Sequence, residues 1–376
     1  MKTKDFDHLI LMFVIFFYVF GIIMIYSASG YYAYKHLDAY PGYFAVKHLM
    51  FGLIGLILLF FGNWINLENS RKHIGIALIV IAALLILVLI PGIGNRAGGA
   101  ARWIKIGFLK IQPSEFVKIF LIFFIANFID RNRNEMDSFW RGFFPPMLII
   151  GILLGLIVIE PDFSTSMAIG ALSVTMLFIG GVKINHLLTL FLIGALLAGA
   201  IVLHSPYKLN RVKAWLNIDA DPLSKGYHIT RSKLAICTGG FLGKGLSNSE
   251  VKIAGLPESH TDFIFAIMCE ELGYAGIMFI LFFYLVLIYR GIKVVLNITG
   301  AYLKFIAIGI TLMLVMHLTI NTGVVTGLLP TTGITLPFLS YGGSSLIAFM
   351  FSMGILLNIS SLTNDKLSGE RDVRKI

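Results

Sequence analysis

The sequence predicts an all-α polytopic membrane protein with about ten transmembrane helices. Three observations predict this fold: the 376-residue chain is 57% hydrophobic, only 13% of its residues are charged, and its apolar residues form long continuous runs. A soluble domain carries about 25% charged residues, and a membrane-crossing helix needs about 20 mostly apolar ones. Continuous runs exclude the alternating pattern of a porin-type barrel, and the composition excludes disordered and disulfide-rich secreted chains.

Ten apolar segments are expected to span the membrane. Asn321, Gly327 and Pro330 divide the last apolar run, which contains no charged residue, into the ninth and tenth spans. The first segment lacks a small-residue cleavage site and is followed by further spans, so we expect it to stay in the mature chain. The expected spans cover approximately residues 9–25, 50–64, 74–90, 113–128, 147–159, 164–181, 184–203 and 262–289, and two segments within 305–362.

The net charge of +10 comes from 30 Lys and Arg against 20 Asp and Glu. Basic residues collect on the cytoplasmic side of membrane proteins, so this excess indicates topology, and no nucleic-acid partner is expected. When residues 204–261 are left out of the count, the charges favour cytoplasmic termini. We expect one transmembrane domain over 1–376, a long extracytoplasmic loop over 204–261 between the seventh and eighth spans, and a cytoplasmic tail over 363–376.

Two segments expected on the outer side are nevertheless rich in basic residues. A concave face of this kind would attract phosphate-bearing ligands, whereas a solvated loop would bind anionic headgroups non-specifically. Both interpretations are open at this point. The residues are Arg96, Arg102, Lys105, Lys110, Lys208, Arg211, Lys213, Lys225, Arg231, Lys233, Lys244 and Lys252.

Ionisable residues at the ends of the fourth, fifth and sixth spans are candidate functional residues, because charges are costly in lipid. Glu115 and Lys118 lie three residues apart, which places them on one helical face, where they can pair. The pair is either structural or in contact with the substrate. In the turn Glu160-Pro161-Asp162, we expect Glu160 to be solvated, and Asp162 is the better functional candidate or part of a cation site.

Asp262 lies where a long polar segment meets an apolar helix start. A carboxylate there either caps the helix or acts in catalysis. Glu270 and Glu271 lie two turns further along the same span, and at least one of them must find a partner in the bundle. We interpret these two glutamates as structural or coupling residues.

Two glycine-rich regions differ in meaning. Residues 239–245 lack the strand and helix of a dinucleotide-binding unit, but their amides and Lys244 could form an anion nest. Residues 330–333 and 337–345, which include Ser340 and Ser344, break helical geometry at membrane depth. Such backbone is tolerated only inside protein or facing a wet cavity, so an internal polar site is expected here.

The chain resembles the SEDS family, the FtsW, RodA and SpoVE type of bacterial cell-wall polymerase. Four ordered motifs carry the resemblance, which extends over nearly the whole chain. They are ARWIKIGFLKIQPSEFVK at 101–118, EPDFSTS at 160–166, LPESHTDFIFAIMCEELG at 256–273 and GLLPTTGITLPFLSYGGSS at 327–345. ITLPF and the Val324-Val325 pair favour the FtsW branch. Ser164 and Ser247 replace common glycines, and His228 stands where glutamine is frequent.

The resemblance implies a lipid II polymerase in the bacterial cytoplasmic membrane, with its active site facing outward. It implies that Asp262 is the essential acid. It implies a class B penicillin-binding protein transpeptidase as partner, together with other divisome or elongasome membrane proteins. No cofactor is expected with certainty, and a divalent cation at the diphosphate is left open. The expected substrate-binding residues are Arg102, Glu115, Lys118, Asp162, Lys244, His260, Ser340 and Ser344.

The chemistry of such a reaction agrees with the residue types. A sugar hydroxyl is a poor nucleophile until a base removes its proton, whereas a lipid diphosphate is already a good leaving group. One base beside cations therefore suffices, while a glycoside hydrolase needs two opposed carboxylates. Two other functions are open: a flippase for lipid II, and a scaffold that recruits the transpeptidase without chemistry of its own. Polymerisation of labelled lipid II by the purified protein separates them.

Overall fold

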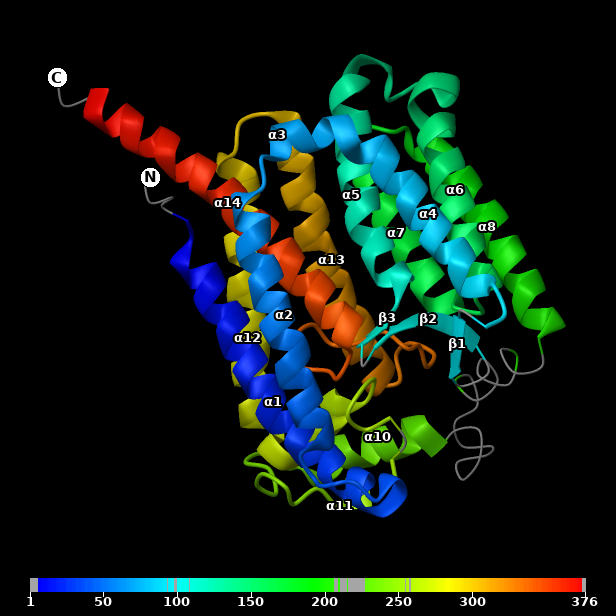
Figure 1. The fold of residues 1–376 in the computed structure, drawn as a ribbon, viewed down its shortest axis with the longest axis vertical. Coiled ribbons are helices and arrows are strands. Elements are labelled where there is room, and N and C mark those ends of the chain that lie inside the picture. Colours follow the sequence, from blue (N-terminus) through cyan, green and yellow to red (C-terminus); the bar gives the residue numbers. More distant parts are fainter. Residues whose placement is uncertain are drawn as a thin grey trace.

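Ten long helices run back and forth through the molecule and match the ten expected spans (Figure 1). The computed structural model describes residues 6–92, 94–97, 100–107, 109–205, 209, 215, 227–253, 255–256 and 258–373. The long helices are α1 (His8–Leu37), α2 (Tyr43–Trp64), α4 (Ile74–Leu89), α5 (Pro113–Arg131), α6 (Phe144–Ile159), α7 (Phe163–Ile179), α8 (Ile184–His204), α12 (Ile264–Asn297), α13 (Ala301–Val325) and α14 (Gly343–Val373).

Shorter elements connect these helices. Leu67–Ser70 (α3) and Arg71–His73 lead into α4, and Phe139–Phe143 leads into α6. A further short turn covers Arg133–Glu135. Helices α10 (Tyr227–Thr238) and α11 (Glu250–Ile253) lie within the segment expected as a long loop. Four of the expected basic residues, Lys208, Arg211, Lys213 and Lys225, fall outside the described residues.

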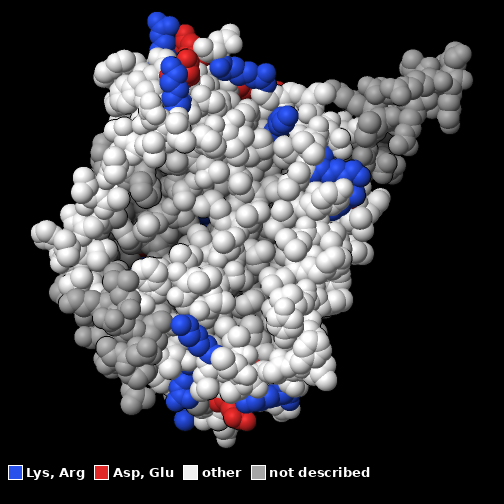
Figure 2. Space-filling view, turned by 180° about the vertical axis from the view of Figure 1, so that it is seen from behind, with Lys and Arg blue, Asp and Glu red and all other residues white. Residues whose placement is uncertain are grey.

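The protein is a multi-pass membrane protein. Within the described residues, seven helices are long and apolar enough to cross a bilayer, and Phe163–Ile179 and Ile184–Leu196 are shorter apolar helices. Helix α5 is of similar length but carries Glu115 and Lys118. On the face shown in Figure 2, Lys, Arg, Asp and Glu gather at the two ends of the molecule, and the band between them shows almost none. This is the charge distribution of a membrane-embedded bundle.

A small antiparallel sheet lies at one end of the bundle, and the sequence did not predict it. Its strands are β1 (Gly94–Ala97), β2 (Ala100–Ile106) and β3 (Leu109–Ile111), in the order β1-β2-β3. Their short lengths give almost no period-two signal in a segment rich in glycine and basic residues. We call the end of the molecule that carries this sheet, α10 and α11 the sheet end; α1 begins and α14 finishes at the opposite end (Figure 1).

Helix α12 is kinked, and residues 239–245 fill the kink. Gly273 has φ 66° and ψ −172°, a conformation that glycine adopts readily. The carbonyls of Glu270 and Glu271 accept the amides of Lys244 (2.9 Å) and Gly245 (3.0 Å). The backbone groups that the kink frees are thus paired by the glycine-rich segment, as an interrupted helix requires.

Glu270 and Glu271 both find cationic partners, whereas the sequence required a partner for at least one of them. Lys244 Nζ lies 2.9 Å from Glu270 Oε1, and Lys252 Nζ lies 2.6 Å from Glu271 Oε1. Ser27 of α1 donates its hydroxyl to Glu271. The two ion pairs therefore fasten the segment between α10 and α11 to α12, and the second pair also includes α1.

Helix α14 lies at the centre of the bundle and packs closely on α2. Of the residues in its most apolar stretch of 18, 89% are buried. Small residues permit the contact: a Cβ on Gly354 would lie 2.0 Å from the carbonyl oxygen of Leu59, and one on Gly62 would lie 2.9 Å from that of Phe351. Close approach through glycine is a usual device of membrane helix pairs. The helix continues without a break from Gly343 to Val373, into the segment expected as a tail.

We predict that Gly354→Ala destabilises the protein by about 1–3 kcal/mol, because the added methyl group forces α2 and α14 apart. Gly151→Ala is the matched control, since a Cβ at that helical position meets nothing within 4 Å among the described residues. Thermal unfolding of both variants in one detergent measures the effect. Equal unfolding midpoints in the parent and Gly354→Ala would contradict the packing described here.

Candidate functional site

The link between α13 and α14, residues 326–342, is non-helical and lies at the sheet end. Side chains of neighbouring elements bind its backbone. Asn321 Nδ2 donates to the Ile334 carbonyl (2.9 Å), and the Tyr284 hydroxyl donates to the Pro337 carbonyl (2.5 Å). The Tyr341 amide donates to the His260 carbonyl (2.9 Å). These contacts hold the second half of the link, residues 334–341, inside protein, whereas Leu328 and Gly333 in the first half are exposed.

Asp262 faces this link. A Cβ on Gly333, an exposed residue, would lie 3.8 Å from Asp262 Oδ2. The backbone carbonyl of Asp262 accepts Asn321 Nδ2 at 3.0 Å. The cap position of α12 is Phe263, which makes no capping side-chain hydrogen bond. Asp262 is partly exposed and lies one residue ahead of that cap position.

A second group of polar side chains surrounds Lys118. Its Nζ lies 2.8 Å from Glu115 Oε2, so the predicted pair is confirmed, and both side chains are largely buried. Lys118 Nζ also lies 3.1 Å from His317 Nε2. The Thr335 and Ser345 hydroxyls are 2.9 Å apart, and Ser345 also hydrogen-bonds Glu115. This Lys118 cluster joins α5, α13, the 326–342 link and the start of α14.

A third group surrounds Asp162, which begins α7. Its Oδ2 accepts Gln112 Nε2 at 2.9 Å, and its Oδ1 lies 3.7 Å from Arg102 NH1. Burial raises the pKa of Asp162, and the Arg102 guanidinium partly offsets that effect. The backbone N–H of Gln112 donates to Ser344 Oγ (2.9 Å), and the Ser344 hydroxyl donates in turn to the Lys110 carbonyl. Ser344 thus fastens the start of α14 to the segment before α5.

Glu160 is fully buried, and the expectation that it is solvated was wrong. Neither of its carboxyl oxygens has a hydrogen-bond partner among the described residues. Arg102 extends from β2 over the turn and donates to the Glu160 and Pro161 carbonyls. Burial, reinforced by the negative charge of Asp162, raises the pKa of Glu160 to about 8, so this carboxyl is protonated at neutral pH.

Three predicted substrate-binding residues make structural contacts. Lys244 Nζ lies between Glu270 (2.9 Å) and Glu250 (3.2 Å), and the bond to Glu270 raises its pKa. Its charge is thus matched by carboxylates. Ser340 Oγ accepts the Leu336 amide at 2.9 Å.

The third of these residues, His260, is packed among aromatic rings. Its ring lies 4.3 Å from that of Phe44 and 5.8 Å from that of Tyr341, between centroids. Burial lowers its pKa to about 4, so the imidazole is neutral at physiological pH.

The sequence reasoning missed Gln112, His317, Thr335 and Ser345 as members of the site and used Asn321 only as a helix breaker. One signal was available: His317 and Asn321 are polar residues four apart in an otherwise apolar span, which places them on one helical face. The others are short polar side chains in motifs, where only the folded structure shows their partners.

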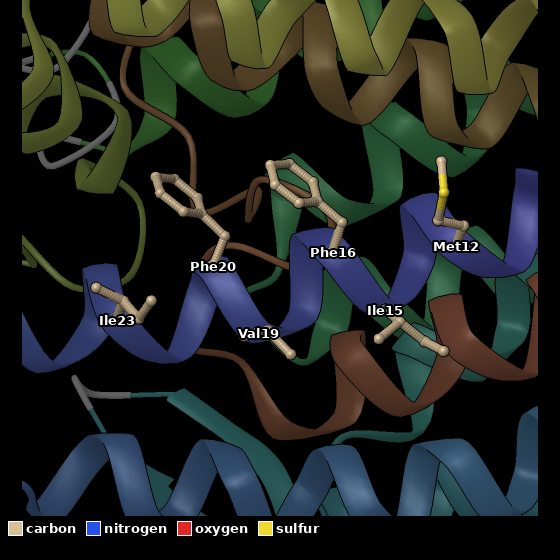
Figure 3. Close-up of a pocket in the computed structure, with 6 residues that line it drawn as sticks. All are labelled: Met12, Ile15, Phe16, Val19, Phe20 and Ile23. Atoms are coloured by element: carbon tan, nitrogen blue, oxygen red, sulfur yellow. The ribbon is translucent and has the colours of Figure 1, made fainter.

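Two further features bear on what the site can hold. In the described part of the chain, no group of three or more His, Cys, Asp or Glu side chains is arranged to hold a metal ion, so we derive no step through a cation. A shallow pocket on the membrane-facing side of α1 is wholly apolar and offers no chemistry (Figure 3). It is lined by Met12, Ile15, Phe16, Val19, Phe20 and Ile23.

The family model of FtsW, RodA and SpoVE, described as "Cell cycle protein", matches residues 7–365. The chain belongs to this family, as its four motifs predicted. Stage V sporulation protein E of Bacillus subtilis (strain 168) is 41% identical over 360 residues, 96% of this chain and 98% of that protein. The probable peptidoglycan glycosyltransferase FtsW of Trichlorobacter lovleyi is 39% identical and covers 96% of this chain and 94% of its own length.

Solved structures have the same fold. One, described as "Structural coordination of polymerization and crosslinking by a peptidoglycan synthase complex", matches with a TM-score of 0.80 at 26% identity, over 96% of this chain and 99% of that one. The crystal structure of Thermus thermophilus RodA matches with a TM-score of 0.70 at 24% identity, over 96% of this chain and 98% of RodA. The RodA likeness supports the polytopic helical fold.

We predict that the parent protein loses stability as the pH rises from about 5 to 8 and that Glu160→Gln removes part of this loss. The folded protein keeps the Glu160 proton up to a pKa of about 8, whereas the unfolded chain releases it near the ordinary value of 4.5. The contribution of Glu160 to the free energy of unfolding is therefore fully present below pH 4.5. It falls as the pH rises to 8, by up to about 1.4 kcal/mol per pH unit.

The measurement is the thermal unfolding midpoint of both proteins across this pH range. Glu135→Gln serves as the control, because that carboxylate is exposed on the surface beside Arg141. A Glu160→Gln profile parallel to that of the parent would contradict the assignment of a buried, protonated carboxyl.

Proposed function

We propose that the protein is a peptidoglycan glycosyltransferase that polymerises lipid II into glycan strands and releases undecaprenyl diphosphate. The observation that carries the proposal is the placement of Asp262, a partly exposed carboxylate at the start of an apolar helix, facing the 326–342 link. The name of the Trichlorobacter lovleyi relative, a probable peptidoglycan glycosyltransferase, supports the reaction. We place it at the outer face of the bacterial cytoplasmic membrane, with both termini in the cytoplasm.

In the proposed reaction, Asp262 is the general base. It takes the proton from the 4-hydroxyl of the acceptor N-acetylglucosamine as that oxygen attacks the anomeric carbon of the donor sugar. The new glycosidic bond forms as the bond to the diphosphate breaks, and the bonding electrons leave with the diphosphate oxygen. The proton stays on Asp262 until solvent removes it. Glu115, Lys118 and Asp162 shape the surrounding polar site.

Arg102 is the residue we propose for the phosphate contact. Its side chain is 28% exposed, whereas that of Lys118 is 3% exposed and already donates to Glu115. A guanidinium has five N–H donors, and Arg102 uses some of them on the Glu160 and Pro161 carbonyls. NH1 lies 3.7 Å from Asp162 Oδ1, and its N–H groups are the ones we propose to stabilise charge on the leaving diphosphate.

We further propose a class B penicillin-binding protein transpeptidase as partner, and other divisome or elongasome membrane proteins in the same assembly. The solved structure described as a peptidoglycan synthase complex, in which polymerisation and crosslinking are coordinated, supports this proposal. The similarity to SpoVE and FtsW supports a role in division or sporulation, in line with the ITLPF motif.

We predict that Arg102→Ala loses more polymerising activity than Arg141→Ala. Arg102 contacts the Asp162 turn, whereas Arg141 is 71% exposed, pairs with Glu135 and lies in the short segment that leads into α6, at the opposite end of the bundle. Charge-assisted contacts to a developing anion are typically worth about 10²-fold or more in rate. The measurement is the rate of glycan formation from lipid II at matched expression. Equal rates in the two variants would contradict the proposed role of Arg102 in binding the diphosphate.

We predict that Asp262→Asn abolishes polymerisation to near background, because a base of this kind contributes about 10²–10⁴-fold. The amide keeps the size of the side chain but does not accept the proton as a carboxylate does. The measurement is glycan-strand formation from lipid II by the purified variant with its partner transpeptidase present.

Asp137→Asn is the control, since Asp137 is an exposed residue that pairs with Lys183 near α6. Expression, thermal stability and co-purification of the partner are matched to the parent. Near-parental activity of Asp262→Asn would move the search for a base to Glu115 or Asp162.

A further inference from the structure

His317 has a defined tautomer in this structure. Its Nδ1 lies 3.2 Å from the Thr335 carbonyl oxygen, and its Nε2 lies 3.1 Å from Lys118 Nζ. A carbonyl oxygen only accepts, so Nδ1 must carry the hydrogen; an ammonium only donates, so Nε2 must offer its lone pair. His317 is therefore a neutral imidazole with both nitrogens in use, and it connects the buried lysine to the 326–342 link.

Asn321 lies one turn further along the same face of α13. Its Nδ2 group has two hydrogens: one goes to the Ile334 carbonyl (2.9 Å) and the other to the Asp262 carbonyl (3.0 Å). His317 and Asn321 thus hold two consecutive carbonyls of the link, those of Thr335 and Ile334. We call these two side chains the α13 clamp.

The clamp fixes the surroundings of Asp262. Gly333, beside the Asp262 carboxylate, directly precedes Ile334, and the Asp262 backbone itself is bound by Asn321. Both side chains of the clamp are almost fully buried, so a lost hydrogen bond would leave a carbonyl unpaired in a dry region. The backbone would then shift to find another partner.

We propose that His317 and Asn321 are positioning residues for the transfer reaction. They fix the position of the Asp262 carboxylate. His317 also links that position to the Lys118–Glu115 pair, because it contacts Lys118. The proposal rests on the proposed function of Asp262 as general base. Neither residue touches the reacting atoms; each acts by holding the backbone to which the base belongs.

The test uses two substitutions that differ only in hydrogen bonding. In His317→Gln, the amide oxygen accepts from Lys118 and the amide nitrogen donates to Thr335, so both contacts survive. His317→Leu fills similar volume and keeps neither contact. Thr319→Val, on the exposed side of the same helix, is the control. Each variant is assayed as the full-length protein for kcat and KM on lipid II.

We expect His317→Leu to lose about 10²-fold in kcat with little change in KM, because the base is displaced while substrate binding persists. His317→Gln and Thr319→Val should stay near the parent. Asn321→Asp, which removes both donors, should resemble His317→Leu. Equal kcat in His317→Gln and His317→Leu would overturn the proposal, whether both are active or both impaired.

A second measurement does not depend on catalysis. The thermal unfolding midpoints of His317→Leu, Lys118→Met and the double variant should be non-additive, because the two side chains are in contact. Additive effects would overturn the proposed coupling. If the parent does not polymerise lipid II, the proposed function fails by itself, and this cycle still decides whether the clamp couples to Lys118.

Discussion

The need to pair every backbone polar group of the 326–342 link governs the arrangement of the site. Non-helical backbone within a membrane bundle is stable only where protein or trapped water supplies its hydrogen bonds. Three side chains from two helices, Tyr284, His317 and Asn321, bind three carbonyls of this link. Because Asn321 also binds the Asp262 backbone, the link and the carboxylate have fixed relative positions.

Charge neutralisation is the second constraint. Lys118 pairs with Glu115, Lys252 with Glu271 and Arg102 with Asp162, so these cations are each matched by a carboxylate. An uncompensated buried charge is costly, and removing one partner of such a pair costs about 3–5 kcal/mol. Arg102 donates to the backbone carbonyl of Glu160 and not to its carboxyl group. Glu160 avoids the free-energy cost of a buried charge by keeping its proton.

Much of the fold, and less of the site, was predictable from the sequence. Hydropathy identified all ten long helices, since membrane spans depend on local composition. The Glu115–Lys118 pair followed from helical spacing, and the need for a partner for at least one of Glu270 and Glu271 followed from the cost of buried charge. Burial of Glu160 did not follow, because it depends on a strand some 60 residues away in sequence that lays Arg102 over the turn. Tertiary contacts of this kind leave no local pattern.

The position of the base agrees with a reaction between lipid-linked sugars. Asp262 is partly exposed, while residues Ile264–Glu271 of α12 are buried, so the carboxylate lies where a polar surface meets the apolar bundle. A donor whose polyprenyl chain stays in the bilayer would present its sugar and diphosphate at this level. Each buried methylene contributes about 0.8 kcal/mol, so the chain can supply affinity while the sugar is oriented. A single base then suffices, because the diphosphate departs without a proton from the enzyme.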